Sequence, residues 1–414
     1  MLKLGLIGLI ILLTLGITKP FIGHHDWNGV YYSNIARNYL QVGLLTSRLG
    51  QVTEFGVIEE PQSFYTHYPP LLTLIMAGWF KLVGVGDWQA RLVPLVFTIG
   101  SLLVLVQLFN YLKFKPWASL AGLAVGLTPM WRYFSRMPSQ EALIVFFSLA
   151  SLLFFLQGKK RSFYWMVILN GLSGWAGYWL YPWLLLLNKR RQWLVKAGII
   201  LVIIFFLHLG HTYLLTGSAV GGGLLEALLL RLNLSPPPEF TWWNYLILEK
   251  GRLAAFYTLT LLGAAVLSTL IKRQRLLWVL LGWGLSYPLI FSNVVFVHDY
   301  FNIFFIPWLA VATAYLFIRA KPALVIVFAL LVFWERNPFY QALMVTHSFQ
   351  PGYELGQQIN QAVPMAETAF VIGSDEFIEP QNLFVSYYSN RNIIYLNDTR
   401  SLPNEAKYVF NLDR

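Results

Sequence analysis

The sequence predicts an all-α protein that crosses a membrane many times and ends in a small extracytoplasmic α/β domain. Of the 414 residues, 57% are hydrophobic and 12% are charged, whereas ordinary soluble domains carry about 25% charged residues. Aromatic residues make up 17% of the chain, and such rings are enriched where a membrane meets water. Apolar runs of roughly spanning length recur over residues 1–335, and hydropathy falls after them. We therefore expect a transmembrane domain over 1–335 and a soluble domain over 336–414.

Lys and Arg occur in short clusters between the apolar runs and give the chain a net charge of +11. This arrangement differs from the basic face of a nucleic-acid-binding domain, so we expect no nucleic-acid partner. Short basic loops stay in the cytoplasm, and the clusters therefore predict the topology. They are Lys3; Lys113 and Lys115; Lys159, Lys160 and Arg161; Lys189, Arg190 and Arg191; Lys272, Arg273 and Arg275; and Arg319 and Lys321.

The first apolar run, residues 4–17, lacks the small-residue cleavage site of a signal peptide. We interpret it as an uncleaved first span with a cytoplasmic N-terminus. Placing every basic cluster inside gives about eleven spans in all. The others are 90–112, 117–131, 140–157, 163–178, 180–188, 193–211, 252–271, 276–291, 300–318 and 322–334. Segment 180–188 is too short to cross alone unless Tyr181-Pro182 belongs to a tilted or broken helix, so its status as a full span stays open.

Two long loops fall outside the membrane, at about residues 19–89 and 212–251. In the first, counting residues 71–83 as a span would reverse every later loop, so we interpret them as an interfacial or re-entrant helix. Residues 29–40 are amphipathic and predict a helix lying on the membrane surface.

The soluble domain is predicted to contain one helix and three strands. The helix is expected near 353–363, and the strands at 368–372, 383–387 and 393–396. The C-terminal domain then lies on the extracytoplasmic side.

Few acidic residues adjoin the spans on the predicted outside face, and Asp26 is the first of them, directly after His24-His25. A carboxylate there can deprotonate a hydroxyl or help to hold a metal. A solvated loop acid is the alternative. Glu141 begins a later span close to Arg132 and Arg136, which suits a phosphate, although helix capping also explains this acid.

Two aromatic motifs face the same side. In Tyr65-Thr66-His67-Tyr68-Pro69-Pro70 the prolines fix a loop at the interface, either for binding or as a rigid entry to the next helix. His298-Asp299-Tyr300 opens a span, where the His-Asp pair suits a phosphate or an acceptor and Tyr300 suits interfacial anchoring. The chain has no Cys, which excludes a thiolate nucleophile and Cys-ligated zinc, and a site built from Asp26 with His24, His25 or His67 has no diagnostic spacing.

The motifs, taken in order, resemble those of GT-C glycosyltransferases over about residues 1–335. More narrowly, they are similar to protein mannosyltransferases and aminoarabinose–lipid A transferases. The matching segments are His25-Asp26, Tyr68-Pro69-Pro70-Leu71, Ala90-Arg91-Leu92-Val93-Pro94, Arg136 through Glu141, and His298-Asp299-Tyr300 before Ile306-Pro307.

The resemblance implies transfer of a sugar from a polyprenyl-phosphate donor to a lipid, glycan or protein on the extracytoplasmic face of the plasma membrane, usually with inversion. It implies that Asp26 is the catalytic base or the acid that orients the acceptor. It also implies that Glu141 occupies the position of a second acidic residue, which is Asp in many relatives. Candidates for the donor phosphate are Arg132, Arg136, Lys250, Arg252 and His298. Candidates for substrate contacts are His25, His67, Tyr68, Asp299 and Tyr300.

A divalent cation, Mg²⁺ or Mn²⁺, stays open as a cofactor, with Asp26 and Glu141 as its ligands if it is present. The alternative function is a polyprenyl-lipid flippase or transporter without glycosyl transfer. That class is expected to show paired broken helices in matching halves, a pattern that the sequence does not display.

Overall fold

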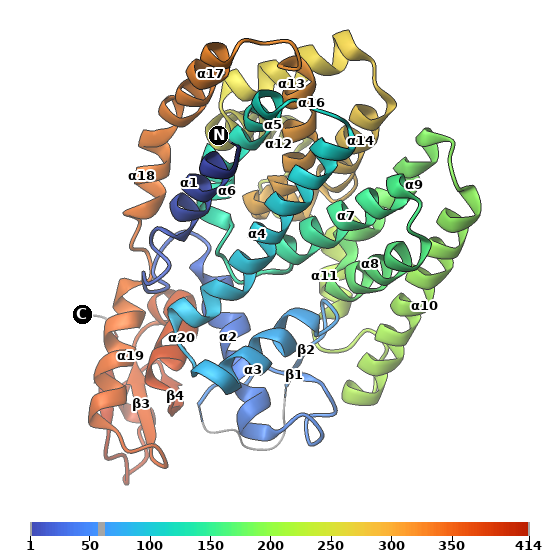
Figure 1. Ribbon diagram of the computed structural model, residues 1–414. Coiled ribbons are helices and arrows are strands. Elements are labelled where there is room, and N and C mark those ends of the chain that lie inside the picture. The colour runs from blue at the N-terminus through green and yellow to red at the C-terminus, as the bar shows by residue number, and fades with distance from the viewer. Residues whose placement is uncertain (1, 57–62, 413–414) are drawn as a thin grey trace.

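The computed structural model describes residues 2–56 and 63–412 and is mainly helical (Figure 1). Four helical segments are long and apolar enough to cross a membrane, and the number rises to six if each of two bent helix pairs is one span. The four are Asp87–Tyr111, Gln140–Gln157, Arg191–Thr216 and Asp299–Leu316. The chain is therefore a membrane protein, and the predicted total of about eleven spans stays a prediction.

The helices of the larger part run from α1 to α18. They are α1 (Leu2–Thr14), α2 (Asp26–Val42), α3 (Leu71–Val83), α4 (Asp87–Tyr111), α5 (Pro116–Leu123), α6 (Pro129–Phe134), α7 (Gln140–Gln157), α8 (Lys160–Ser173), α9 (Leu180–Leu184), α10 (Arg191–Thr216), α11 (Leu224–Arg231), α12 (Trp242–Tyr257), α13 (Leu259–Lys272), α14 (Arg275–Ile290), α15 (Ser292–Val297), α16 (Ile306–Leu316), α17 (Pro322–Glu335) and α18 (Asn337–Met344). Short 3₁₀ helices join them at Ala124–Leu127, Trp175–Trp179, Leu185–Leu187 and Asp299–Phe305.

Three predicted spans are interrupted in the structure. Segment 117–131 stops being one helix at Thr128, which is extended before Pro129. Segment 163–178 breaks at Gly174. The chain bends by 101° between α12 and α13, where Thr258 has a positive φ of 65°. The prediction of a continuous span over 252–271 is therefore wrong.

Segment 180–188 contains α9 and a 3₁₀ turn, and it runs back along α8. The Asn170 side chain donates a hydrogen bond to the Tyr181 hydroxyl at 3.1 Å. Further along, the Arg190 guanidinium donates to the Phe155 carbonyl at 2.5 Å. The basic clusters before α8 and before α10 therefore lie at the same end of the helix bundle, as the topology requires.

Two further contacts bring other basic clusters to this end. The Tyr111 hydroxyl donates to the Leu156 carbonyl at 2.9 Å, and the rings of Phe114 and Tyr315 are 4.7 Å apart. The helices α2 and α3 and the C-terminal sheet lie at the opposite end (Figure 1). These contacts place four of the six basic clusters at one end of the bundle, and the cytoplasmic orientation of that end stays a prediction.

Helix α2 is buried rather than spread on a membrane surface. Its polar residues Asn34, Arg37 and Asn38 are all buried, because α3 covers one side and α20 of the C-terminal part covers another. The Arg37 guanidinium donates to the Tyr387 carbonyl at 3.3 Å. The prediction of a surface helix over 29–40 is therefore wrong, since the polar face meets protein instead of water.

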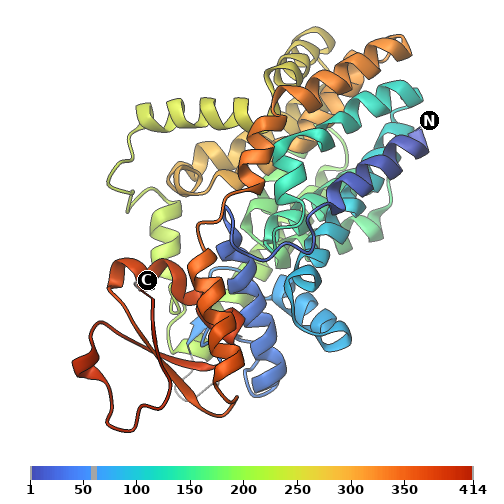
Figure 2. The ribbon, with the colours of Figure 1, turned by 90° about the vertical axis from the view of Figure 1, so that its left-hand side faces the viewer.

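The C-terminal part is a small α/β unit packed beside α2 (Figures 1 and 2). Its sheet has the parallel order β4-β3-β5. The elements are α19 (Gln350–Ala362), β3 (Thr368–Ile372), α20 (Asp375–Ser389), β4 (Asn392–Leu396), a 3₁₀ turn (Thr399–Ser401) and β5 (Val409–Asn411). The predicted strand over 383–387 is wrong, because these residues belong to α20, the crossover helix that connects two parallel strands.

Candidate active site

A cavity of about 560 Å³ is lined in part by the start of α2, a helix that lies opposite the basic clusters (Figure 1). Separate chain segments line it: the start of α2, the loop after β2, α11, and the junction between α15 and the following 3₁₀ helix. Four of the residues predicted to contact substrate or phosphate meet there. They are His67, Tyr68, His298 and Tyr300.

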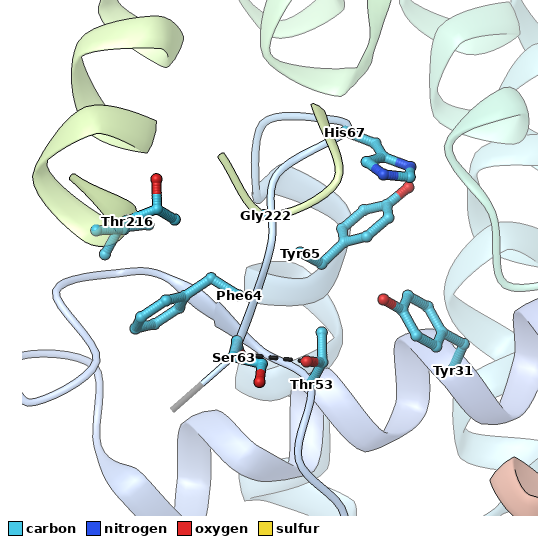
Figure 3. A pocket seen from close by; sticks show the side chains of 9 residues that line it. Tyr31, Thr53, Ser63, Phe64, Tyr65, His67, Thr216 and Gly222 are labelled. Carbon is cyan, nitrogen blue, oxygen red and sulfur yellow. Dashed lines mark hydrogen bonds between the residues drawn. The ribbon is translucent and has the colours of Figure 1, made fainter. Parts of the chain in front are cut away.

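A second cavity of about 570 Å³ adjoins the first, because both are lined by Tyr31, Tyr65 and His67. Figure 3 shows this second cavity. The short strands β1 (Gln51–Val52) and β2 (Phe64–Tyr65) pair antiparallel, and Phe64 and Tyr65 point to opposite sides, as successive residues of a strand do (Figure 3). The alternation directs the Tyr65 ring toward His67 (Figure 3), with ring centroids 4.6 Å apart.

Side chains from distant segments hold the loop that carries His67 and Tyr68. The Gln51 amide donates to the Tyr68 carbonyl at 2.9 Å. The Trp175 indole donates to the His67 carbonyl at 2.8 Å. Because buried backbone groups need partners, these bonds fix the two side chains at the cavity.

Arg231, the last residue of α11, is a cation of this cavity that the sequence analysis did not single out. It is 8% exposed and donates to the Tyr68 hydroxyl at 2.8 Å and to the Ala227 carbonyl at 2.9 Å. Its Nε has no hydrogen-bond partner among the described residues. Within residues 2–56 and 63–412, no carboxylate lies at ion-pair distance from it. A buried cation without a paired carboxylate favours an anionic ligand.

His67 and Gly223 shape the space around Arg231. Burial, followed by the neighbouring Arg231 charge, lowers the pKa of His67 to about 4, so its imidazole is neutral at pH 7. Gly223 has a positive φ of 80°, and a Cβ there would lie 2.8 Å from the His67 Nε2 atom. Glycine is therefore required for α11 to begin so close to the imidazole. His298 is also neutral, because burial and the nearby His25 lower its pKa to about 3.

Asp26 is buried at the start of α2, and both of its oxygens have partners. Oδ2 accepts hydrogen bonds from the backbone N–H groups of Ile22 and Gly23 at 3.0 and 2.7 Å. Oδ1 pairs with the Arg91 guanidinium at 3.1 Å. The carboxylate is 4% exposed and closes the turn that contains His24 and His25. In this geometry it positions a loop.

Asp299 joins the two histidines of that turn. Its Oδ2 lies 2.9 Å from His24 Nε2, and its Oδ1 lies 3.0 Å from His25 Nε2. These three side chains form a group of possible metal ligands with all donor atoms within 4.8 Å of one another. Asp26 and Glu141, the metal ligands expected from sequence, are not part of this group.

Glu141 lies in the first turn of α7 and is not among the residues that line the cavity. It is 3% exposed, and its Oε2 has no hydrogen-bond partner among the described residues. It lies close enough to Arg231, Tyr32 and Tyr300 to interact with each electrostatically. Glu141 therefore sits beneath the cavity instead of at its surface.

Of the predicted phosphate ligands, the arginines near α6 lie away from the cavity. The Arg132 guanidinium donates to the Asn337 side chain at 3.0 Å and lies 3.6 Å from the centre of the Tyr340 ring. Arg136 donates to the Leu15 carbonyl and is also buried. Both side chains anchor α18 to the bundle.

The two remaining predicted cations also lie apart from the cavity. Arg252 donates to the carbonyls of Val295 and Phe296 at 2.6 and 3.0 Å and pairs with Glu249 at 2.8 Å. It therefore satisfies the C-terminal end of α15. Lys250 is exposed on α12. Among the predicted phosphate ligands, His298 is the one that lines the cavity.

No protein-family model and no curated protein matches the sequence. The fold resembles two crystal structures of ArnT from Cupriavidus metallidurans, one in the apo state and one bound to undecaprenyl phosphate, with a TM-score of 0.48 for each. Sequence identity is 12% and 13%, and each comparison covers 96% of this chain and 86% of ArnT.

Proposed function

We propose that this chain is an integral membrane glycosyltransferase. It transfers a sugar from a polyprenyl-phosphate donor to an acceptor on the extracytoplasmic face of the plasma membrane. The observation that carries the proposal is the cavity around Arg231. It combines a buried cation that has no carboxylate at ion-pair distance among the described residues with neutral imidazoles and aromatic rings, beside the start of α2, a helix that lies opposite the basic clusters.

Arg231 is proposed to bind the phosphate of the donor. A lipid phosphate is already a leaving group, so the enzyme mainly has to stabilise the negative charge that develops when the bond to the sugar breaks. A guanidinium forms strong charge-assisted hydrogen bonds to phosphate. The unpartnered Nε of Arg231 supplies one such donor, while the hydroxyl of Tyr68 holds the guanidinium in place.

Glu226 is proposed to act as the general base. It is the one carboxylate among the described residues that line the cavity. It would accept the proton of the acceptor hydroxyl while that oxygen forms a bond to the anomeric carbon of the sugar. The bond between that carbon and the phosphate oxygen breaks, and the phosphate leaves with the electron pair. Attack from the opposite face inverts the anomeric centre.

Asp26 and Glu141 are proposed to support the site from behind. Asp26 orients the acceptor side of the cavity, because it fixes the turn at the start of α2, directly before the cavity-lining Trp27. Glu141 interacts with Arg231 from beneath and so balances part of its charge. The rings of Trp27 and Tyr31 stack with centroids 4.6 Å apart and offer a flat apolar surface for the sugar or the first isoprene units.

Binding of polyprenyl phosphate to the purified protein in detergent tests the donor role of Arg231. Removing a charge-assisted hydrogen bond costs about 1.5–3 kcal/mol, so Arg231→Ala is expected to weaken binding by about tenfold to a hundredfold. Arg231→Lys keeps the positive charge but lacks the forked guanidinium. Its affinity for polyprenyl phosphate is expected to lie between those of the wild type and Arg231→Ala. Arg319→Ala, which removes an exposed arginine at the far end, serves as the matched control.

Arg132→Ala separates this assignment from the one based on sequence. We expect its affinity for polyprenyl phosphate to equal that of the wild type, because its guanidinium faces α18. Unchanged affinity in Arg231→Ala, or a large loss in Arg132→Ala, contradicts the proposed phosphate site.

A further inference from the structure

We propose that His24, His25 and Asp299 bind a divalent transition-metal ion of the zinc class. The site brings together the turn before α2 and the 3₁₀ helix before α16, which are far apart in sequence. It differs from the Mg²⁺ or Mn²⁺ site on Asp26 and Glu141 that the sequence left open. Metal binding is separate from the proposed sugar transfer, and either can fail without the other.

Each of the two imidazole nitrogens lies at ligand-to-ligand distance from one oxygen of the Asp299 carboxylate. Zinc bonds imidazole nitrogen and carboxylate oxygen at about 2.0–2.2 Å, which places neighbouring ligands of a tetrahedral site about 3.3–3.6 Å apart. The two nitrogen–oxygen separations here are 2.9 and 3.0 Å. The imidazole rings of His24 and His25 lie side by side, with centroids 4.2 Å apart.

A hydrogen bond accounts for the contact of Asp299 with His24 but not for its contact with His25. His24 Nε2 and Asp299 Oδ2 form a hydrogen bond at 2.9 Å. His25 Nε2 approaches Oδ1 to 3.0 Å, although no hydrogen bond of good geometry joins these two atoms. Both imidazoles therefore face the same carboxylate, which is the arrangement that a shared cation requires.

The backbone of the turn that carries His24 and His25 is held in a conformation that keeps both imidazoles near Asp299. His25 adopts a left-handed conformation with φ of 55°, which is uncommon outside glycine and tends to occur at functional sites. Asp26 fixes this turn through the N–H groups of Ile22 and Gly23, and the Tyr133 hydroxyl donates to the His24 carbonyl at 2.8 Å. These bonds hold the ligands of the proposed site in place.

The chemistry of the donors selects the ion. Two nitrogen donors and one carboxylate suit Zn²⁺, whereas Mg²⁺ prefers oxygen ligands. Asp26 is excluded as a ligand, since a cation bound to it would lie beside the Arg91 guanidinium. Three protein ligands leave a fourth position open, as in catalytic zinc sites, and the side chains of His24 and His25 are 34% and 20% exposed. Water can therefore reach the ion.

The test uses the full-length protein in detergent, first stripped of metal by a chelator and then titrated with Zn²⁺ against a chromophoric chelator. Wild type is expected to bind one Zn²⁺ per chain and to keep it in millimolar Mg²⁺. His25→Ala and Asp299→Asn are each expected to weaken binding at least about tenfold. His211→Ala, which removes a histidine of α10 outside this group, is expected to bind like wild type. Equal affinity in all four proteins, or no stoichiometric site in wild type, overturns the proposal.

X-ray absorption of the zinc-loaded wild type identifies the ligands of the ion, and it tests the proposed site even if the variants fail to fold. The expected spectrum shows two imidazole ligands and oxygen donors at about 2.0–2.2 Å. A spectrum without paired imidazoles overturns the site. Because neither measurement requires sugar transfer, a negative result leaves the proposed glycosyltransferase standing.

Discussion

Asp26 shows how a residue chosen from sequence gains a different physical meaning in the structure. Its position after the first apolar run marks it as a candidate base, and Arg91 appears in a separate motif. Nothing in the sequence pairs the two, since 65 residues separate them. The structure joins them in a buried ion pair at 3.1 Å, and the carboxylate becomes a structural anchor of the His24–His25 turn.

The Asp26–Arg91 pair carries a prediction on stability. Both side chains are nearly buried, at 5% and 6% exposure, so removing one partner leaves an uncompensated charge. Asp26→Asn and Arg91→Ala are each expected to lower the free energy of unfolding by about 3–5 kcal/mol. Denaturant unfolding in detergent measures this loss, with the exposed Glu405→Gln as control. A loss below about 1 kcal/mol in both variants contradicts the buried pair.

His67 predicts a pH dependence of stability. Its pKa is about 4 in the folded protein, against 6.5 for the free side chain. Between these values the unfolded state binds more protons, so stability is expected to rise with pH from about 4 to 6.5 and then to stop rising on account of this residue. His67→Gln is expected to flatten that part of the curve. An unchanged slope in the variant shows that His67 is not the titrating group.

The cavity was only partly predictable at this scale. His67, Tyr68, His298 and Tyr300 stand in motifs that the basic clusters assign to one side of the membrane, and the structure brings them to one cavity. Arg231 lies at the end of a leucine-rich run in a loop and offers no motif. The contact of Asp299 with His24 spans 275 positions in the chain and follows only from tertiary packing.

At the scale of elements, hydropathy locates helices well and their interruptions poorly. The predicted segment 140–157 coincides with α7, because its apolar run is continuous and forms one unbroken helix. The bend at Thr258 has no Gly or Pro to announce it. Partners that lie elsewhere stabilise it: Glu335 Oε1 and Oε2 accept from the N–H groups of Leu259 and Thr260 at 2.6 and 3.1 Å.

The cap at this bend predicts a measurable cost. Glu335 satisfies two free N–H groups at the start of α13 and interacts favourably with the helix dipole. Glu335→Ala is expected to destabilise the protein by about 0.5–2 kcal/mol, and Glu335→Gln by less. Thermal unfolding in detergent compares the two. Equal stability of Glu335→Ala and wild type shows that the bend is held by packing alone.

At the scale of the whole molecule, the C-terminal part is packed onto the segment before α2 and onto the start of α4. The Tyr388 hydroxyl accepts from the N–H of Phe21 at 2.7 Å and donates to Asp87 at 3.1 Å. Phe384 stacks on Phe349 with centroids 4.1 Å apart and is fully buried. Sequence composition separates this part as soluble, but it does not reveal that α20 covers α2.

This contact predicts that the C-terminal part protects α2. Phe384→Ala is expected to cost about 3–5 kcal/mol, because it opens a cavity between α19 and α20. Amide hydrogen exchange is expected to speed up in α20 and also in α2. The exposed Phe377 supplies the control Phe377→Ala. Faster exchange confined to α19 and α20 contradicts coupling between the two parts.

The most direct test of the proposed glycosyltransferase follows radiolabelled sugar from a polyprenyl-phosphate donor in proteoliposomes, with envelope extract as the source of acceptors. Wild type and Arg319→Ala are expected to release polyprenyl phosphate and to transfer the label. Glu226→Gln is expected to transfer sugar about 10²- to 10⁴-fold more slowly, as for loss of a general base. Arg231→Ala is expected both to transfer sugar more slowly and to bind the donor more weakly. Movement of intact donor across the bilayer, without release of polyprenyl phosphate, contradicts the account and identifies a flippase.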